Sequence, residues 1–169
     1  KRVTTISQNA EIMYLINKSN VRPGELTKDQ VKMFEAFVKE YSDKDRATLG
    51  NVYAKGYASP EGDFNYNKSL AQRRTQTLSN YISSQYPALK KAPVYRTEGV
   101  GEDWEGLKAA VSGSTLSNKD KILFIIEHNS NDTERESAIR ELDNDKTYHI
   151  LLEEFYPALR RIRPYIKAE

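Results

Sequence analysis

Short apolar runs separated by turn-forming residues mark the first part of the chain. Residues 11–16 read Glu-Ile-Met-Tyr-Leu-Ile, and this run predicts a strand. Residues 17–25 contain the dipeptide Pro-Gly and predict a turn. A helix is predicted to begin at Thr27, because Gln30 three residues later completes a capping box. Its apolar face repeats at helical spacing and comprises Val31, Phe34, Val38 and Tyr41.

A strand, a long helix and another strand are predicted next. After a polar loop at 42–46, the strand covers 49–57, with positions 52, 54 and 56 on one face and the tyrosines at 53 and 57 on the other. A loop at 58–63 leads into a helix over about 66–84. The following strand covers 94–98 and is entered from Pro93. The tripeptide Gly99-Val-Gly101 lacks the third glycine of a dinucleotide-binding motif and is interpreted as a turn.

Between Trp104 and about Glu154 the apolar residues recur at a different spacing, which is typical of helices. Ser117 and Asp120 are predicted to cap one of these helices, and Pro157 to end the last. The polar run 129–136 predicts an exposed loop. The predicted helices lie at 104–111, around 122–126, around 138–142 and around 148–155.

A final strand is predicted over 160–166, where Pro164 would confine it to a sheet edge or a strand end. Its arginines at 160, 161 and 163 are interpreted as a solvated face. The order of elements predicts an α/β protein, an α+β sandwich of helices on a small sheet. We expect one domain over 1–169, with a helical insertion at 104–154 before the last strand.

Composition and charge remove several classes of function. The net charge is only +2, from 26 basic and 24 acidic residues, which argues against bulk binding of nucleic acid. The chain has no cysteine, and His128 and His149 are too far apart for a helical ligand pair, so neither a metal site nor a cofactor is expected. No apolar run approaches the roughly 20 residues that span a bilayer. Because the chain starts at Lys1 without a signal segment, we expect a processed or excised part of a longer protein.

One arginine stands out in the segment 56–82. Arg74 lies four residues after Leu70 and four before Leu78, so it shares their apolar stripe. A guanidinium facing inward is costly unless it finds an acceptor, and its planar fork suits a carboxylate. The acceptor could be an internal partner such as Glu61 or Asp63, it could be a ligand, or the side chain could reach water. The loop before this helix is a favourable place for an anion, because helix N-termini offer free N–H groups.

The same segment resembles the OmpA-like peptidoglycan-binding domain family, whose core pattern is G-[HY]-T-D-x-x-G-x-x-x-Y-N-x-x-L-S-x-x-R-A. The resemblance covers the first half of the chain and the closing strand, and it does not explain residues 104–154. The residues that match at the right spacing are Gly56, Tyr57, Gly62, Tyr66, Asn67, Leu70 and Arg74.

The resemblance implies a site for diaminopimelate of the peptidoglycan stem peptide. In the family the helix arginine takes a carboxylate, which would be the role of Arg74, and the asparagine at Asn67 would bond the ligand or brace the loop. The family aspartate that takes the amino group is replaced by Ser59, so either Glu61 supplies the missing charge or binding is weakened. Ala58 and Ala71 also depart from the family pattern. The implied ligand-binding residues are Arg74, Asn67, Ser59, Glu61, Gly62 and Tyr57.

The function implied by the resemblance is non-catalytic anchoring of an outer-membrane or surface protein to peptidoglycan. The domain would lie in the periplasm, attached to the outer membrane through a part of the parent protein outside this chain. An alternative is a scaffold domain with a vestigial pocket, in which the helical insertion binds another envelope protein. An enzyme such as a cell-wall hydrolase is disfavoured, because the sequence shows no convincing set of nucleophile, base or metal ligands.

Overall fold

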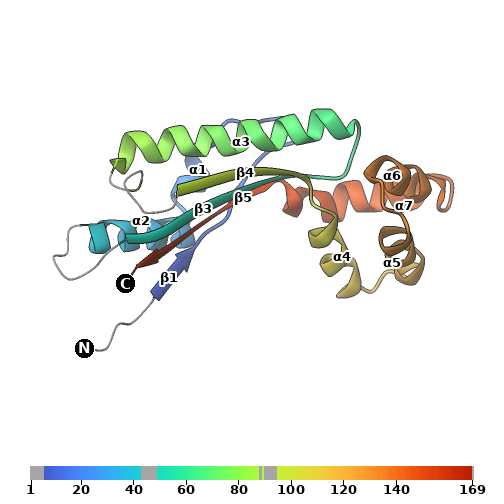
Figure 1. Cartoon of the computed structure of the whole chain (residues 1–169). Coiled ribbons are helices and arrows are strands. Elements are labelled where there is room, and N and C mark those ends of the chain that lie inside the picture. The colour runs from blue at the N-terminus through green and yellow to red at the C-terminus, as the bar shows by residue number, and fades with distance from the viewer. Residues whose placement is uncertain (1–5, 43–48, 88, 90–94, 169) are drawn as a thin grey trace.

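A mixed sheet forms the centre of the molecule. The structure, a computed structural model, describes residues 6–42, 49–87, 89 and 95–168. The strand β3 pairs in parallel with β4 and antiparallel with β5, and the order across the sheet is β1-β5-β3-β4 with the short β2 also beside β5 (Figure 1). This arrangement confirms the predicted α/β class with a helical insertion before the last strand. The strands are β1 (Ile6–Asn9), β2 (Ile12–Met13), β3 (Leu49–Ala58), β4 (Tyr95–Glu102) and β5 (Arg161–Ala168).

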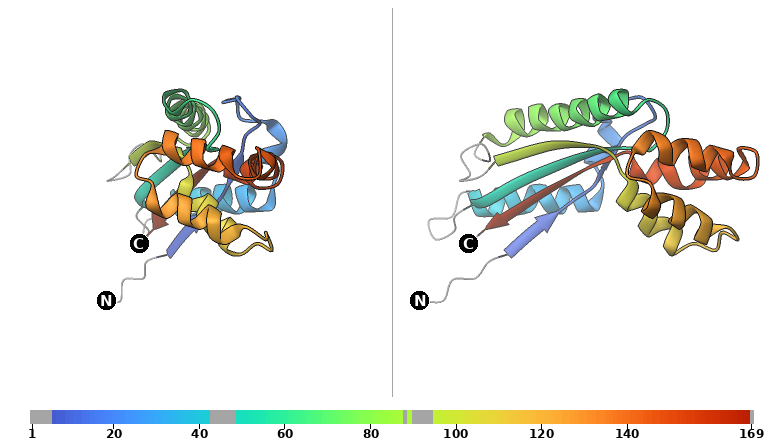
Figure 2. Two further views of the ribbon diagram at one scale, coloured as in Figure 1. Left: turned by 90° about the vertical axis from the view of Figure 1, so that its right-hand side faces the viewer. Right: turned by 45° about the vertical axis from the view of Figure 1, so that its right-hand side comes forward.

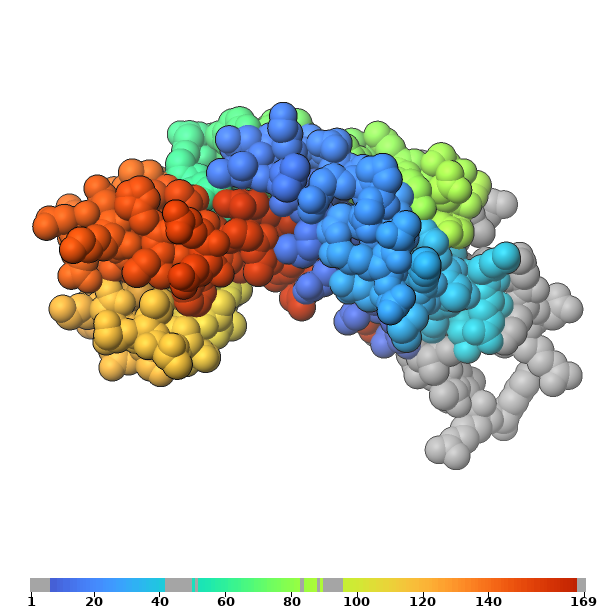
Figure 3. All heavy atoms as spheres, turned by 180° about the vertical axis from the view of Figure 1, so that it is seen from behind, coloured from blue at the N-terminus to red at the C-terminus, as the bar shows by residue number. Residues whose placement is uncertain are grey.

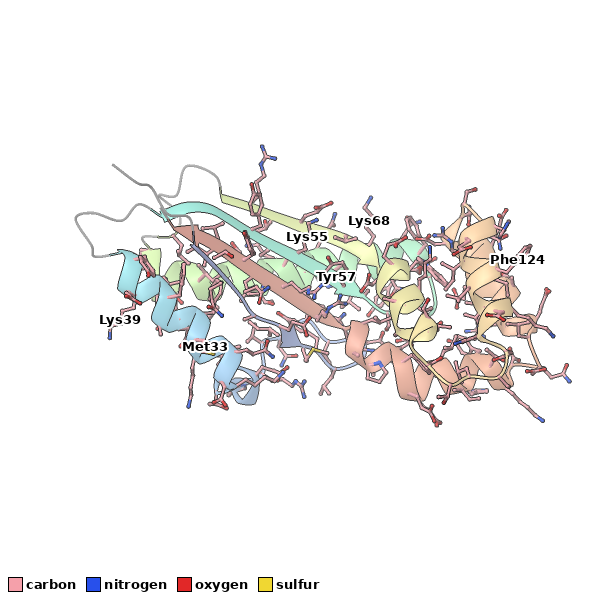
Figure 4. The ribbon with its side chains drawn as sticks, turned by 90° about the horizontal axis from the view of Figure 1, so that it is seen from below. Met33, Lys39, Lys55, Tyr57, Lys68 and Phe124 are labelled. Atoms are coloured by element: carbon pink, nitrogen blue, oxygen red, sulfur yellow. The ribbon has the colours of Figure 1, made fainter. Side chains whose placement is uncertain are left out.

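Three helices cover one face of this sheet. The long α3 (Phe64–Gln85) packs over β3 and β4, while α1 (Pro23–Leu26) and α2 (Asp29–Ser42) lie on the β1 side. Alternation along β3 buries Val52 and Ala54 against these helices, as the sequence predicts. The principal members of this core are Val31, Phe34, Val38, Val52, Ala54, Leu78, Ile82, Ile162 and Ile166. The opposite face of the sheet carries Lys55 and Tyr57, on the side away from α3 (Figure 4).

The helical insertion is packed around a core of its own. It extends beyond the end of the sheet (Figure 2), and in the space-filling view it forms a separate lobe (Figure 3). Its elements are α4 (Trp104–Ser112), α5 (Lys119–His128), α6 (Asp132–Glu141), α7 (Lys146–Ile150), the π-helix η2 (Leu151–Phe155) and the 3-10 helix η3 (Tyr156–Leu159). Its buried residues include Trp104, Leu107, Val111, Ile122, Ile126, Ile139, Leu151 and Tyr156. The helical segment therefore continues to Leu159, and Pro157 lies inside its last turn.

Two predicted caps and one predicted turn are wrong. Thr27 ends α1 and donates back to the Gly24 carbonyl, while the Gln30 side chain accepts from the Glu11 amide instead of closing a box. The helix α5 begins after Asn118, which makes no side-chain cap bond. The segment 99–101 continues β4, and Gly99 lies opposite Gly56 in the register. A Cβ at either glycine would overlap α3, so both allow close approach of helix and sheet.

The boundaries of three other predicted segments also change. The run 11–16 contributes only the two-residue β2, and a separate β1 precedes it. Within the run 129–136, α6 already begins at Asp132, so only residues 129–131 lie outside helices. The loop predicted at 42–46 and the entry to β4 at Pro93 lie mostly outside the described residues.

Pro164 was expected at a sheet edge or a strand end, yet it lies in the middle of β5, which is an interior strand. Its carbonyl accepts from the amide of Ala10, and Ala10 lies in the two-residue gap between β1 and β2. In an antiparallel ladder the N–H and C=O of one residue point to the same neighbour. The N–H that proline lacks would therefore face the break between these two edge strands, where the ladder is interrupted anyway.

Candidate functional site

The residues proposed from the sequence gather where β3 ends and α3 begins. Asp63 caps α3, because its side chain accepts from the Tyr66 amide at 2.7 Å. Gly62 has a φ of 78°, a left-handed conformation that side chains other than glycine rarely adopt. Together these two residues turn the chain from the strand into the helix. Ser59, Asn67 and Arg74 are all buried around this turn.

Arg74 is fully buried, and each of its three guanidinium nitrogens donates to a backbone carbonyl. The acceptors are Lys18 for Nε at 2.9 Å, Tyr57 for Nη1 at 2.9 Å and Leu15 for Nη2 at 3.0 Å. The guanidinium also lies 5.2 Å from the centre of the Tyr14 ring. Burial lowers the pKa of Arg74 to about 10, so it remains charged at neutral pH. Its partners are thus neutral carbonyls, and neither Glu61 nor Asp63 is its ion-pair partner.

Glu61 pairs instead with Arg160, which follows the insertion. The guanidinium Nη2 of Arg160 lies 3.1 Å from Glu61 Oε1, and its Nε donates to the Ser59 hydroxyl at 3.1 Å. Ser59 in turn donates to Glu61 at 2.8 Å. Arg160 was predicted to be solvated, but it is buried, because these two loop residues satisfy its polar atoms. The charges of this group sum to zero, so no carboxylate charge is left over for an ammonium ion.

Asn67 braces the loop and contacts a buried acid. Its amide donates to the Glu61 carbonyl at 2.6 Å and to Glu102 Oε1 at 3.1 Å, while the Trp104 indole donates to Glu102 Oε2 at 3.1 Å. Burial raises the pKa of Glu102 to about 7, although these two hydrogen bonds oppose the rise. Asn67 therefore ties the loop to the start of the insertion.

Glu102→Gln should remove a pH dependence of stability. The carboxyl titrates near its ordinary pKa of 4.5 when unfolded and near 7 when folded, so the folded state binds more protons between these values. Its contribution is thus most favourable below about pH 4.5 and is lost as the pH rises through 7. We expect the stability of the parent relative to Glu102→Gln to fall by roughly 1–3 kcal/mol between pH 4.5 and 8. Urea denaturation of both proteins across this pH range measures the difference. If the free energies of unfolding of the two proteins change in parallel with pH, the prediction is contradicted.

Gly62 is held by a residue of the insertion. Its amide donates to Glu136 Oε1 at 2.9 Å, and Arg140 Nε lies 3.3 Å from the same oxygen. Arg140 also stacks on the Tyr148 ring at 4.1 Å and donates to the Tyr148 hydroxyl at 3.0 Å. The helices α6 and α7 therefore present a carboxylate to the loop.

Tyr57 contributes to the site through its backbone only. Its carbonyl accepts from Arg74, whereas its ring lies on the opposite face of the sheet, 4.5 Å from the Arg161 guanidinium. On that face it lines a cleft of about 400 Å³ together with Trp104 and Arg135. Of the six proposed residues, the structure thus brings five together around the loop and places the Tyr57 ring on the other face of the sheet.

Sequence reasoning missed Arg160, Glu102 and Glu136 as neighbours of the loop. Arg160 had one available signal, because an arginine directly before an apolar strand is a candidate for burial with an acid. Glu136 lies 74 residues from Gly62, and no local pattern indicates such a pairing. Among the described residues no group of three acids, histidines or cysteines could hold a metal ion. Within the same ranges, none of the helices has the length and hydropathy needed to cross a membrane.

Comparison with protein-family models finds no matching family, and comparison with curated proteins finds no match. Among solved structures, the chain is similar to the OmpA-like domain of FopA1 from Francisella tularensis subsp. tularensis SCHU S4. The two share 13% sequence identity and superpose with a TM-score of 0.44. The similarity covers 96% of this chain and 73% of that chain.

Proposed function

We propose that the chain is a non-catalytic binding module of the cell envelope that holds peptidoglycan through a carboxylate of the diaminopimelate residue. The observation that supports this most is the state of Arg74, a fully buried cation whose bonds to described residues all end on neutral carbonyls. Burial of a charge without an opposite charge is costly. An anionic ligand would supply that charge.

The guanidinium also has hydrogen-bonding capacity to spare. It carries five N–H groups, and the three carbonyl bonds leave one N–H on each terminal nitrogen. A carboxylate can accept from both terminal nitrogens at once. In this proposal the ligand carboxylate accepts from these two spare N–H groups, and the segment of Leu15 and Lys18, which covers Arg74, shifts to admit it. Leu15 and Ile16 are about half exposed there, so little apolar burial opposes a shift of this segment.

The ammonium group of diaminopimelate would lie near Ser59 and Glu61. In the parent chain Arg160 already neutralises Glu61, so we expect weak binding. In Ser59→Asp two carboxylates would face one arginine, which leaves one negative charge for the ammonium. We therefore expect Ser59→Asp to strengthen binding of a diaminopimelate-containing muropeptide by roughly 1–3 kcal/mol. Calorimetry on the parent, Ser59→Asp and the matched neutral variant Ser59→Asn measures this gain.

The decisive experiment is sedimentation of the chain with purified peptidoglycan, with free diaminopimelate as competitor. Retention that the competitor reverses, and that Ser59→Asp increases, supports the proposal. The proposal fails if neither the parent nor Ser59→Asp is retained. By this proposal the domain lies in the periplasm, joined to the outer membrane through another part of its parent protein.

A second function, a scaffold domain with a vestigial pocket, is favoured by the internal partners of the loop. Arg160 and Glu136 occupy the polar groups of Glu61 and Gly62. The insertion would then provide the contact with another envelope protein. It exposes Phe124, labelled in Figure 4, and Ile150, with 59% and 39% of their surfaces accessible. Failure of both the parent and Ser59→Asp to bind peptidoglycan would leave this function as the better supported one.

A further inference from the structure

The loop at Gly62 already holds a carboxylate from within the chain. Glu136 Oε1 accepts from the Gly62 amide at 2.9 Å, although the two residues lie 74 positions apart. The Glu136 side chain is only 13% exposed, whereas Gly62 itself lies at the surface. A hydrogen bond from an amide to an ionised acceptor is stronger than one between neutral groups. The loop is therefore able to bind a carboxylate.

The insertion holds this carboxylate in place through two further residues. Arg140, one helical turn along α6, contacts the same oxygen of Glu136. Tyr148 of α7 contacts Arg140 both through its ring and through its hydroxyl. Because α6 and α7 supply all three side chains, Glu136 can leave Gly62 only if the side chain rotates or the lobe shifts.

The core of the insertion contains a buried hydroxyl without a partner among the described residues. Tyr156 is fully buried, and its hydroxyl finds no hydrogen-bond partner in the described part of the chain. Burial raises the pKa of Tyr156, and the charges of Glu61 and Glu136 act in the same direction. Buried hydroxyls are seldom left unpaired, and a donor of this kind is suited to an additional oxygen acceptor.

We propose that Glu136 is an internal ligand, which occupies the position of a peptide carboxylate on the Gly62 amide and so makes the insertion a displaceable cap over the loop. This inference rests on the proposed function, because it concerns the same loop. A muropeptide carries more than one carboxylate, so while one pairs with Arg74 another would compete with Glu136 for the Gly62 N–H, and like charges repel at short distance. Binding therefore requires release of Glu136.

The expected size of the effect follows from the populations of the capped and released states. A ligand that binds only the released state has its apparent affinity reduced by the fraction of molecules in that state. If the cap is closed in about nine molecules of ten, its removal should raise affinity roughly tenfold. Glu136→Ala removes both charge and acceptor. Glu136→Gln retains a neutral acceptor for Gly62, and its effect should be smaller.

The test uses the whole chain and two measurements. Calorimetry with a diaminopimelate-containing muropeptide compares the parent, Glu136→Ala, Glu136→Gln and the control Glu141→Gln, which changes an exposed acid on the same helix. Amide hydrogen exchange at Gly62, without ligand, reports the internal contact directly. We expect affinity to rise roughly tenfold in Glu136→Ala, with faster exchange at Gly62, and neither change in the control.

The outcomes separate this inference from the proposed function. If the parent binds the muropeptide and Glu136→Ala binds no more tightly, the inference that Glu136 is a displaceable cap is wrong and the proposed function stands. If Glu136→Ala binds the muropeptide and the parent does not, both the proposed function and the role of Glu136 as a cap are supported. If no variant binds, the proposed function fails and competition at this loop fails with it, whereas faster exchange at Gly62 would still show Glu136 to be a structural clamp.

Discussion

Arg74→Met should lower the free energy of unfolding by roughly 2–4 kcal/mol. Methionine fills much of the same volume but donates no hydrogen bond, so the carbonyls of Leu15, Lys18 and Tyr57 would lose their buried donor. Each lost bond to a charged group is worth about 1.5–3 kcal/mol, and relief from burying the cation offsets part of the sum. Chemical denaturation followed by circular dichroism measures the change.

The neighbouring residue provides the control for this prediction. Arg73 is exposed, donates to Ser69 and lies over the Tyr66 ring, so Arg73→Met should change stability by less than about 0.5 kcal/mol. The loss of stability in Arg74→Lys should lie between those of Arg74→Met and Arg73→Met, because one ammonium cannot reach three carbonyls in the geometry of a guanidinium. Equal stability of Arg74→Met and Arg73→Met would show that the three carbonyl bonds contribute nothing.

A structural role of this size affects how binding experiments on Arg74 are read. If Arg74→Met is largely folded but binds no muropeptide, the loss of binding can be assigned to the missing guanidinium. Ser59→Asp reduces the difficulty, because the aspartate still offers an acceptor to Arg160 and the three carbonyl bonds of Arg74 stay in place. For this reason the loop variant, and not Arg74, carries the test of the proposed function.

Periodicity was sufficient to predict the central elements of the fold. The helix expected over 66–84 is α3 (Phe64–Gln85), and the strand expected over 49–57 is β3 (Leu49–Ala58). Both have a strong apolar repeat, and burial of that repeat is what stabilises them. The inward position of Arg74 was also predictable, because it follows from the spacing of Leu70 and Leu78 alone.

The partners of the site residues could not be predicted, because they come from distant parts of the chain. Arg160 bonds Ser59 across 101 positions, and Arg74 bonds Leu15 across 59. Such pairings depend on how the insertion and the first loop pack, and tertiary packing leaves no local periodic signal. The capping box at Thr27 failed for a related reason, since the Gln30 side chain found a long-range donor in the Glu11 amide.

The two ends of the insertion meet at the end of the sheet (Figure 2), where one ion pair joins them. Asp103 lies at the start of α4 and Arg161 at the start of β5, and their side chains are 2.5 Å apart and almost fully buried. The other Asp103 oxygen accepts from the Gly106 amide and caps α4. A Cβ at Gly106 would overlap the Asp103 carboxylate, so this glycine is required for the cap.

Asp103→Ala should therefore lower the free energy of unfolding by roughly 3–5 kcal/mol. The change removes the cap of α4 and leaves the Arg161 guanidinium buried against the Tyr57 ring without its main counter-charge. Asp103→Asn keeps a cap acceptor but loses the ion pair, so its free energy of unfolding should lie between those of the parent and Asp103→Ala. Urea denaturation of these variants measures the loss.

A double-mutant cycle shows whether the pair or the cap is responsible for that loss. Arg161→Met alone leaves Asp103 buried and unpaired, whereas Asp103→Asn with Arg161→Met leaves no buried charge at either position. If the ion pair joins the two ends of the insertion, the double variant should be more stable than the sum of the single losses predicts, by roughly 1–3 kcal/mol. Gly106→Ala, which displaces the cap without removing a charge, should reproduce only the smaller, capping part of the loss. Strict additivity in the cycle would mean that Asp103 acts through the cap alone and that the insertion is held to the sheet by its other contacts, chiefly Arg160 with Ser59 and Glu61.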